Sequence, residues 1–276
     1  MSFTDYDEAP ESTSILSIRD RYGLFINGSW KAGRGESFAT ISPSTESTIT
    51  TVSEANSADV DVAVAAARTA YDKVWSRMSG AERGKYLFRI ARILQERARE
   101  FAVAETVDNG KPIKETRDVD IPLAAAWFFY YAGWADKLEH VGMGSKPRAL
   151  GVAAQIIPWN FPLLMLAWKV APALAAGNTI VLKPAETTPL TALMFAEVCE
   201  QAGLPNGVVN ILTGHGSVTG AALVAHPGVN KIAFTGSTAV GRQIARTLAG
   251  TDTKLTLELG GKGANIVFDD AALDQA

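Results

Sequence analysis

Five short segments of this 276-residue sequence place polar or glycine residues directly after a predicted strand. They are PWN at Pro158–Asn160, KPAE at Lys183–Glu186, GHG at Gly214–Gly216, TGS at Thr235–Ser237 and ELGG at Glu258–Gly261. Ligands of an open parallel sheet bind outside the carboxyl ends of its strands. The five segments together therefore indicate a ligand site at one edge of such a sheet.

Glu258 and Asn160 have the side chains best suited to catalysis. Glu258 alternates with three leucines and ends a strand beside two glycines, so it can face a cavity, where partial burial would raise its pKa toward that of a general base. A salt bridge with Lys262 is the structural alternative. Asn160 lies between two prolines, and a rigidly held amide can donate to a developing oxyanion. An asparagine that caps a turn is the alternative there.

Two further segments suit a dinucleotide. GSTAVG, residues 236–241, follows a strand and begins a helix, whose N–H groups and dipole favour a pyrophosphate. This spacing is not the usual GxGxxG, and a glycine-assisted turn is the alternative. KPAE offers Lys183 and Glu186 to ribose hydroxyls, and a carboxylate there would repel a 2′-phosphate, which favours NAD over NADP. A surface Lys–Glu pair is the alternative.

The single cysteine and the histidines point to no further chemistry. Cys199 shares its helical face with Ala192, Phe195, Ala196 and Ala202, which is a core pattern, and a thiol buried among apolar groups is inert. The histidines, at positions 140, 215 and 226, lack metal-ligand spacing, so no metal site is expected.

The rest of the sequence predicts the elements that hold these residues. A hairpin turns at Asn27-Gly28, two short extended segments follow within 38–55, and helices are expected from Ser57, from Ala81 to Gly110, and over 121–138. Strands then alternate with helices at 190–202, 218–225 and 238–249. This order predicts an α/β fold: a Rossmann-like parallel sheet with flanking helices, preceded by the hairpin and the first helices.

Composition narrows the class of partner. The net charge of −3 gives no basic excess for nucleic acid or an anionic membrane, and prolines interrupt the longest apolar stretch. One cysteine is compatible with a reducing compartment, so a cytoplasmic protein is expected. Residues 1–20 are predicted to be a mobile acidic tail and 21–260 a cofactor-binding domain, with a possible oligomerisation arm around 137–150.

These motifs together resemble the NAD(P)-dependent aldehyde dehydrogenase superfamily, from LFINGSW to the last residue. The segments that carry the resemblance include GKPIKE, QIIPWNFPLLMLAWKVAPALAAGNTIVLKPAETTP, AGLPNGVVNILTG, KIAFTGSTAVG and LELGGKGANIVFDDA. Two positions depart from the family pattern: Gly263 stands where a small side chain is more usual, and the turn at Ser44 lacks the usual glycine.

The resemblance implies an aldehyde substrate, NAD as cofactor and a role for each motif. Asn160 would be an oxyanion donor, and Glu258 the base that activates water to hydrolyse a cysteine thioester to a free acid. The expected cofactor-binding residues are Ile156, Pro158, Trp159, Asn160, Lys183, Ala185, Glu186, Gly216, Gly220, Phe234, Gly236, Ser237, Val240 and Leu259.

The family's nucleophilic cysteine lies beyond the glutamate, in a second domain. Residues 261–276 are therefore expected to begin a catalytic domain that is otherwise absent, along with most of the aldehyde pocket, and the 276-residue chain alone is expected to be inactive. The predicted strand 264–268 would lack partners and promote aggregation. The partner would be a companion C-terminal half or, as is usual in the family, a second copy. The alternatives are a stand-alone NAD-binding module and an interaction protein that uses residues 141–148.

Overall fold

The computed structural model describes residues 12–141, 147–272 and 274. Residues 1–11 of the predicted tail and 142–146 of the predicted arm lie outside the described residues. In the rest of these two segments, Thr13–Ile15 and Leu138–His140 form short 3₁₀ turns. Within the described ranges, no helix combines the length and the apolar character needed to span a membrane.

The main sheet has seven strands in the described part of the chain, in the order β10–β9–β6–β7–β8–β2–β3. The five strands from β10 to β8 are parallel, and the hairpin β2–β3 continues the sheet antiparallel to β8. The Rossmann-like α/β fold is therefore confirmed. The strands are β2 Leu24–Ile26, β3 Ser29–Lys31, β6 Val152–Ile156, β7 Thr179–Lys183, β8 Val209–Ile211, β9 Lys231–Gly236 and β10 Lys254–Leu259.

The predicted hairpin forms, and it also covers one edge of the parallel sheet. Asn27 and Gly28 adopt φ values of 54° and 71°, as the tight turn requires. The buried side chain of Asn210, on β8, accepts a hydrogen bond from the backbone N–H of Asn27 at 2.9 Å. The turn is therefore fastened to the sheet. A second, three-stranded sheet contains β1 Arg21–Tyr22, β5 Thr48–Ser53 and β4 Ser37–Ile41, in that order.

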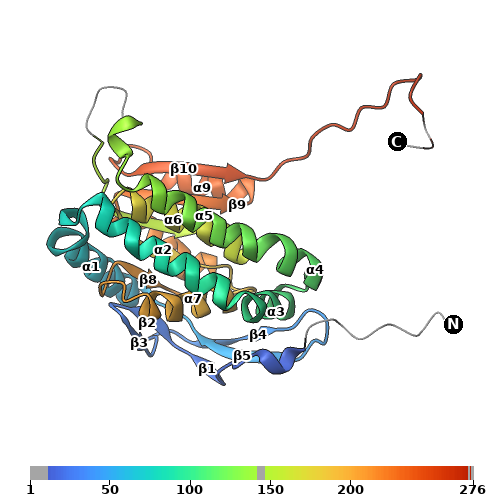
Figure 1. Cartoon of the computed structure of the whole chain (residues 1–276), viewed down its shortest axis with the longest axis horizontal. Helices are drawn as coiled ribbons and strands as arrows, with labels where there is room; N and C mark the ends of the chain where they lie inside the picture. The colour runs from blue at the N-terminus through green and yellow to red at the C-terminus, as the bar shows by residue number, and fades with distance from the viewer. Residues whose placement is uncertain (1–11, 142–146, 273, 275–276) are drawn as a thin grey trace.

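Helices cover both faces of the main sheet (Figure 1). One core cluster joins a face of the sheet to α2, α3, α5, α6 and α7, and another joins the opposite face to α1, α8 and α9. The helices are α1 Ser57–Lys73, α2 Gly80–Glu96, α3 Ala98–Asn109, α4 Ile113–Glu115, α5 Ile121–Trp134, α6 Pro162–Ala175, α7 Leu190–Gln201, α8 Ala221–Ala225 and α9 Thr238–Thr247.

Two predicted helices differ in detail from the observed ones. The run predicted from Ala81 to Gly110 is two helices that are separated at Arg97, whose backbone leaves helical geometry. The Arg97 guanidinium binds Glu100 and Glu197. The helix predicted over 218–225 starts as a π-helical turn at Gly216–Gly220 and continues as α8. A second π-helical turn, Thr116–Asp120, leads into α5.

The strand predicted over 264–268 is wrong. The chain leaves the sheet after β10 and runs away from the body of the molecule (Figure 1). Within the described residues no strand pairs with this segment, and its apolar side chains are exposed, with Ile266 at 69% and Phe268 at 71%. A short apolar run does not form a strand without a neighbour to complete its hydrogen bonds.

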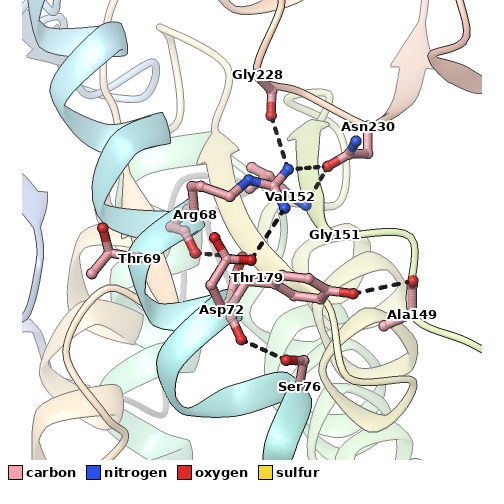
Figure 2. Close-up of polar contacts among 12 residues, drawn as sticks. Arg68, Thr69, Asp72, Ser76, Ala149, Gly151, Val152, Thr179, Gly228 and Asn230 are labelled. Atoms are coloured by element: carbon pink, nitrogen blue, oxygen red, sulfur yellow. Dashed lines mark hydrogen bonds and ion pairs between the residues drawn. The ribbon is translucent and has the colours of Figure 1, made fainter.

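Arg68 of α1 ties this helix to the amino ends of β6 and β9 (Figure 2). Its guanidinium donates to the carbonyl of Gly228 at 3.4 Å and to the side-chain oxygen of Asn230. The same oxygen accepts from the backbone N–H of Val152 at 3.0 Å. A Cβ atom at Gly151 would lie 2.2 Å from it, so only glycine fits there. This network fixes the amino ends of β6 and β9, which lie at the opposite end of the strands from the predicted ligand site.

Candidate active site at the carboxyl ends of the strands

Strand register brings the predicted segments to one edge of the main sheet. Ile156 pairs with both Lys183 and Phe234, and Gly236 pairs with Leu259. The segments that follow β6, β7, β9 and β10 therefore start side by side. This is the edge at which parallel sheets bind their ligands.

A cavity of about 510 Å³, here called the α8–α9 cavity, lies among the π-helical turn before α8, α9 and the sheet edge. Six of the predicted cofactor-binding residues line it: Ile156, Glu186, Gly216, Gly220, Phe234 and Val240. Its other lining residues were not predicted: His215, Ser217, Ala221, Val224, Gln243, Ile244 and Thr247. Apolar walls and a carboxylate at the edge suit a flat heterocycle with an attached sugar.

Lys183 and Glu186 are not the surface pair considered from the sequence. Lys183 is 1% exposed, and its ammonium donates to the carbonyl of Pro184 at 2.8 Å and lies 3.4 Å from a carboxylate oxygen of Glu186. Burial lowers the pKa of Lys183, and the Glu186 charge opposes that change. Burial disfavours ionisation of Glu186, but the Lys183 charge, the hydrogen bonds from the Glu186 backbone and Lys183, and the His215 charge together outweigh it, so the pKa of Glu186 is lowered. Glu186 is therefore held as an acceptor.

His215, at the rim of this cavity, has a fixed partner that the sequence did not reveal. Its backbone N–H and its ring Nδ1 each lie 2.8 Å from the same carboxylate oxygen of Glu54. Its ring also packs on Phe38, with centroids 4.9 Å apart. Glu54 lies in the segment between the small sheet and α1, and no local motif connects it with residue 215.

The start of α9 has the glycine and the cap that the sequence indicated. The hydroxyl of Ser237 accepts from the backbone N–H of Val240 at 3.3 Å and so caps the helix. A Cβ atom at Gly236 would lie 2.6 Å from the Phe234 ring, and one at Gly241 would lie 2.4 Å from Leu259. A side chain at either position would have to displace the end of the Phe234 or the Leu259 side chain. The first helical turn still has N–H groups without partners inside the helix, which suit an anion.

Glu258 lines a separate groove of about 720 Å³ between the sheet and α6, here called the Glu258 groove. Its lining residues are Trp127, Leu150, Ala153, Gln155, Met165, Trp168, Lys169, Pro172, Ala173, Asn178, Lys231, Ala233, Thr235, Thr256 and Glu258. Glu258 and Thr256 share this face, as the alternation predicts. The expected partial burial of Glu258 is wrong: the residue is exposed, because β10 is an edge strand. No ion pair joins it to Lys262 in the described structure.

Lys169 faces the Glu258 groove from α6 and was missed from the sequence. Burial lowers its pKa to about 8, while the Glu258 charge raises it and the Lys231 charge lowers it. A signal was present: Lys169 is the one charged residue in the apolar helix α6. An isolated charge in such a helix indicates a polar cavity beside it.

Asn160 lies in the turn between β6 and α6 and is exposed. It lines neither the α8–α9 cavity nor the Glu258 groove, and the same holds for Pro158, Trp159 and Ala185. The turn itself is fixed on both sides. Ile157 N donates to the carbonyl of Lys183 at 3.1 Å, and the side chain of Asn109 donates to the carbonyl of Trp159.

Cys199 is buried in the core, as its helical pattern predicts. It is 2% exposed, and burial raises the pKa of its thiol well above the ordinary value. The thiolate form needed for nucleophilic attack is therefore strongly disfavoured there. Over the described residues, no group of three or more His, Cys, Asp or Glu side chains is arranged to hold a metal ion.

Residues 30–276 match the model of the aldehyde dehydrogenase family. An aldehyde dehydrogenase of Alternaria alternata is 49% identical over 264 residues, which cover 92% of this chain and 53% of that protein. One of Emericella nidulans is 46% identical over 274 residues, covering 96% of this chain and 55% of that protein. The structure of a Bacillus cereus aldehyde dehydrogenase with NAD⁺ has a TM-score of 0.86 and 44% identity, covering 92% of this chain and 54% of that one. The chain therefore spans about half the length of these relatives.

Proposed function

Because the chain belongs to the aldehyde dehydrogenase family, we propose that its protein oxidises an aldehyde to a carboxylic acid with NAD as the hydride acceptor. The observation that carries the proposal is the α8–α9 cavity, where six residues named from the sequence for cofactor binding come together. The resemblance to a solved NAD⁺ complex supports the same ligand.

The residues of the cavity fit an adenosine group. Ile156, Phe234 and Val240 offer apolar contacts for the base, and Glu186 offers a charged acceptor for ribose hydroxyls. The first turn of α9 offers N–H groups to the pyrophosphate. When bound, NAD supplies the acceptor for the hydride. Every other step depends on protein groups.

Two residues of this chain would act at the reacting carbon. Asn160 would donate its amide hydrogen to the oxyanion that forms when a thiolate attacks the aldehyde. Glu258, in its open groove, would take a proton from the water that hydrolyses the resulting thioester. The nucleophile is not Cys199, whose thiol is buried and has a raised pKa. A cysteine nucleophile is therefore not among the residues of this chain, whose one cysteine is Cys199.

The Glu186 carboxylate predicts a preference for NAD over NADP, because it would repel a 2′-phosphate. Calorimetric titration of the full-length protein with both cofactors measures this preference. Glu186→Gln should narrow the difference in affinity, whereas Glu96→Gln, on the exposed side of α2, should leave it unchanged. Tighter binding of NADP by the unmodified protein would contradict the assignment of Glu186.

The catalytic proposal is tested by NADH formation from small aldehydes. In the full-length protein, Glu258→Gln should keep the first burst of NADH and suppress steady turnover, because hydride transfer precedes hydrolysis. Loss of the burst would remove Glu258 from the hydrolytic step. NAD binding without any NADH formation in the unmodified protein would favour the alternative, a cofactor-binding module.

A further inference from the structure

Two buried carboxyl groups lie behind the turn that carries Asn160. Glu105, on α3, is 0% exposed, and Asp120, in the π-helical turn before α5, is 1% exposed. One oxygen of Glu105 accepts from the backbone N–H of Leu163 at 3.0 Å. The other has no hydrogen-bond partner within the described residues, and Asp120 lies beside Glu105. A buried oxygen with no partner is costly, so this pair needs an explanation.

Lys111, which follows α3, is the cation that the described residues show at this pair. Its ammonium forms an ion pair with Asp120 and lies 3.6 Å from the centroid of the Phe161 ring. One positive charge cannot compensate two carboxylates in an apolar interior. A single proton shared by Glu105 and Asp120 leaves one negative charge for Lys111 and gives the unpartnered oxygen of Glu105 a hydrogen to donate.

Residues at the end of α3 and just after it contact every second residue of the turn around Asn160. Asn109 binds the carbonyl of Trp159, Lys111 covers the ring of Phe161, and Glu105 binds the N–H of Leu163. All three come from one short stretch, the end of α3 and the residues after it. The residues on both sides of Asn160 are therefore held from a single element, while the Asn160 side chain is left exposed.

We propose that Glu105 and Asp120 are positioning residues for Asn160: sharing one proton, they hold segment 159–163 so that the Asn160 amide keeps a fixed direction. This role rests on the proposed oxyanion function of Asn160. Loss of the shared proton would place two negative charges side by side, and their repulsion would displace the Glu105 carboxylate together with the Leu163 N–H that it binds. The groups that face Glu105 are Asp120, Lys111 and the Leu163 N–H.

The pH range of this change follows from the surroundings of Glu105. Burial raises its pKa to about 8; the Leu163 N–H opposes that rise, Asp120 adds to it and Lys111 opposes it. The pair is therefore expected to hold its proton at neutral pH and to lose it in mildly alkaline solution. Glutamine reproduces the protonated form, because its oxygen can accept from Leu163 while its NH₂ donates to Asp120.

A matched control lies one turn along the same helix. Asp108, also on α3, is 3% exposed and accepts from the backbone N–H of Leu190, at the start of α7. It resembles Glu105 in burial and in capping a helix, but it holds no residue of segment 159–163. Asp108→Asn thus reports the effect of removing a buried carboxylate from α3 alone.

The first experiment needs no turnover. Protein labelled with ¹⁵N at asparagine and leucine is followed by NMR from pH 6 to 9.5. The Leu163 amide and the Asn160 side-chain NH₂ should shift together in the unmodified protein and in Asp108→Asn, and should stay constant in Glu105→Gln. The proposal would be overturned if the signal of the Asn160 side-chain NH₂ shifted with pH as much in Glu105→Gln as in the unmodified protein. It would also be overturned if this signal did not shift in the unmodified protein.

The second experiment measures steady-state kinetics of the full-length protein. Glu105→Gln should keep kcat within about twofold at pH 7 and retain more activity than the unmodified protein at pH 9. Glu105→Ala should lower kcat by about 10- to 100-fold at unchanged KM for NAD, as expected for a displaced oxyanion donor. An Asp108→Asn variant with the same loss of kcat would refute the positioning role. If the unmodified protein lacks activity, the proposed function fails, and the NMR titration still decides on Glu105 and Asp120.

Discussion

Asp108→Asn should remove a pH dependence of stability that this one buried carboxyl group imposes. Asp108 accepts from the hydroxyl of Thr40 at 2.8 Å and from the N–H of Leu190 at 2.9 Å. Burial raises its pKa from 3.8 to about 7, although both hydrogen bonds oppose the rise. No lysine or arginine is among the causes of the shift, so desolvation dominates.

The sign follows from proton counting. Below pH 4, both the native and the unfolded chain hold the proton of Asp108, and the group contributes no pH dependence. Between pH 4 and 7 the unfolded chain has released the proton while the native chain retains it, so the free energy of unfolding falls as pH rises. A shift of about three pKa units corresponds to about 4 kcal/mol, spread over this window. Above pH 7 the loss is complete.

The variant isolates this contribution, because asparagine keeps the shape of the protonated group and does not titrate. Relative to the unmodified protein, the free energy of unfolding of Asp108→Asn should increase by about 4 kcal/mol between pH 4 and 7.5. Urea unfolding at several pH values measures it, with coincident tryptophan fluorescence and circular dichroism as the test of two-state behaviour. Asp252→Asn, at an exposed position, is the control. Parallel pH curves for Asp108→Asn and the unmodified protein would refute the reasoning.

Three further predictions concern other parts of the molecule. Cys199 should react with iodoacetamide at neutral pH at least about 100-fold more slowly in the native than in the urea-unfolded protein, because its thiolate is disfavoured; rapid native alkylation would contradict this. Asn230→Ala should lower the free energy of unfolding by about 1–3 kcal/mol, since the donors on Arg68 and Val152 lose their acceptor, whereas Asn230→Asp keeps an acceptor and should recover most of this free energy. Glu258→Gln should lower the pKa of Lys169 below its value of about 8, which NMR of labelled lysine measures; an increase would disprove the interaction across the groove.

Local sequence patterns predicted the sheet and the ends of its strands. Strands such as 179–183 and 231–236 are short apolar runs bounded by turn residues, and parallel register then brings their ends together without further information. Six residues of the α8–α9 cavity could be named because each directly follows a strand or belongs to a family motif. The place of the hairpin beside β8 could not be predicted, since a hairpin pattern does not specify its neighbour.

Contacts between distant segments were the part that the sequence did not reveal. The sequence left open whether Lys183 belongs to a surface ion pair, because its burial depends on Gly220 and the helices that cover the strand end. Glu105 lies 58 residues from its hydrogen-bond partner Leu163, and no local pattern marks such a pair. Glu258 was expected to be partly buried because the alternation of a strand identifies its two faces but not its position in the sheet. As the edge strand, β10 leaves that residue exposed.

The two carboxylates of α3 also bear on how this stretch of sequence can change over evolution. Glu105 and Asp108 stand on one side of the helix and cap the first turns of α6 and α7. Each residue of an α-helix advances the chain by about 100°, so one inserted residue between Ala98 and Glu105 would rotate both carboxylates away from their partners at once. Many single substitutions there would leave the caps in place. Insertions and deletions should therefore be rare in α3 among related sequences and should collect in exposed turns such as residues 44–46.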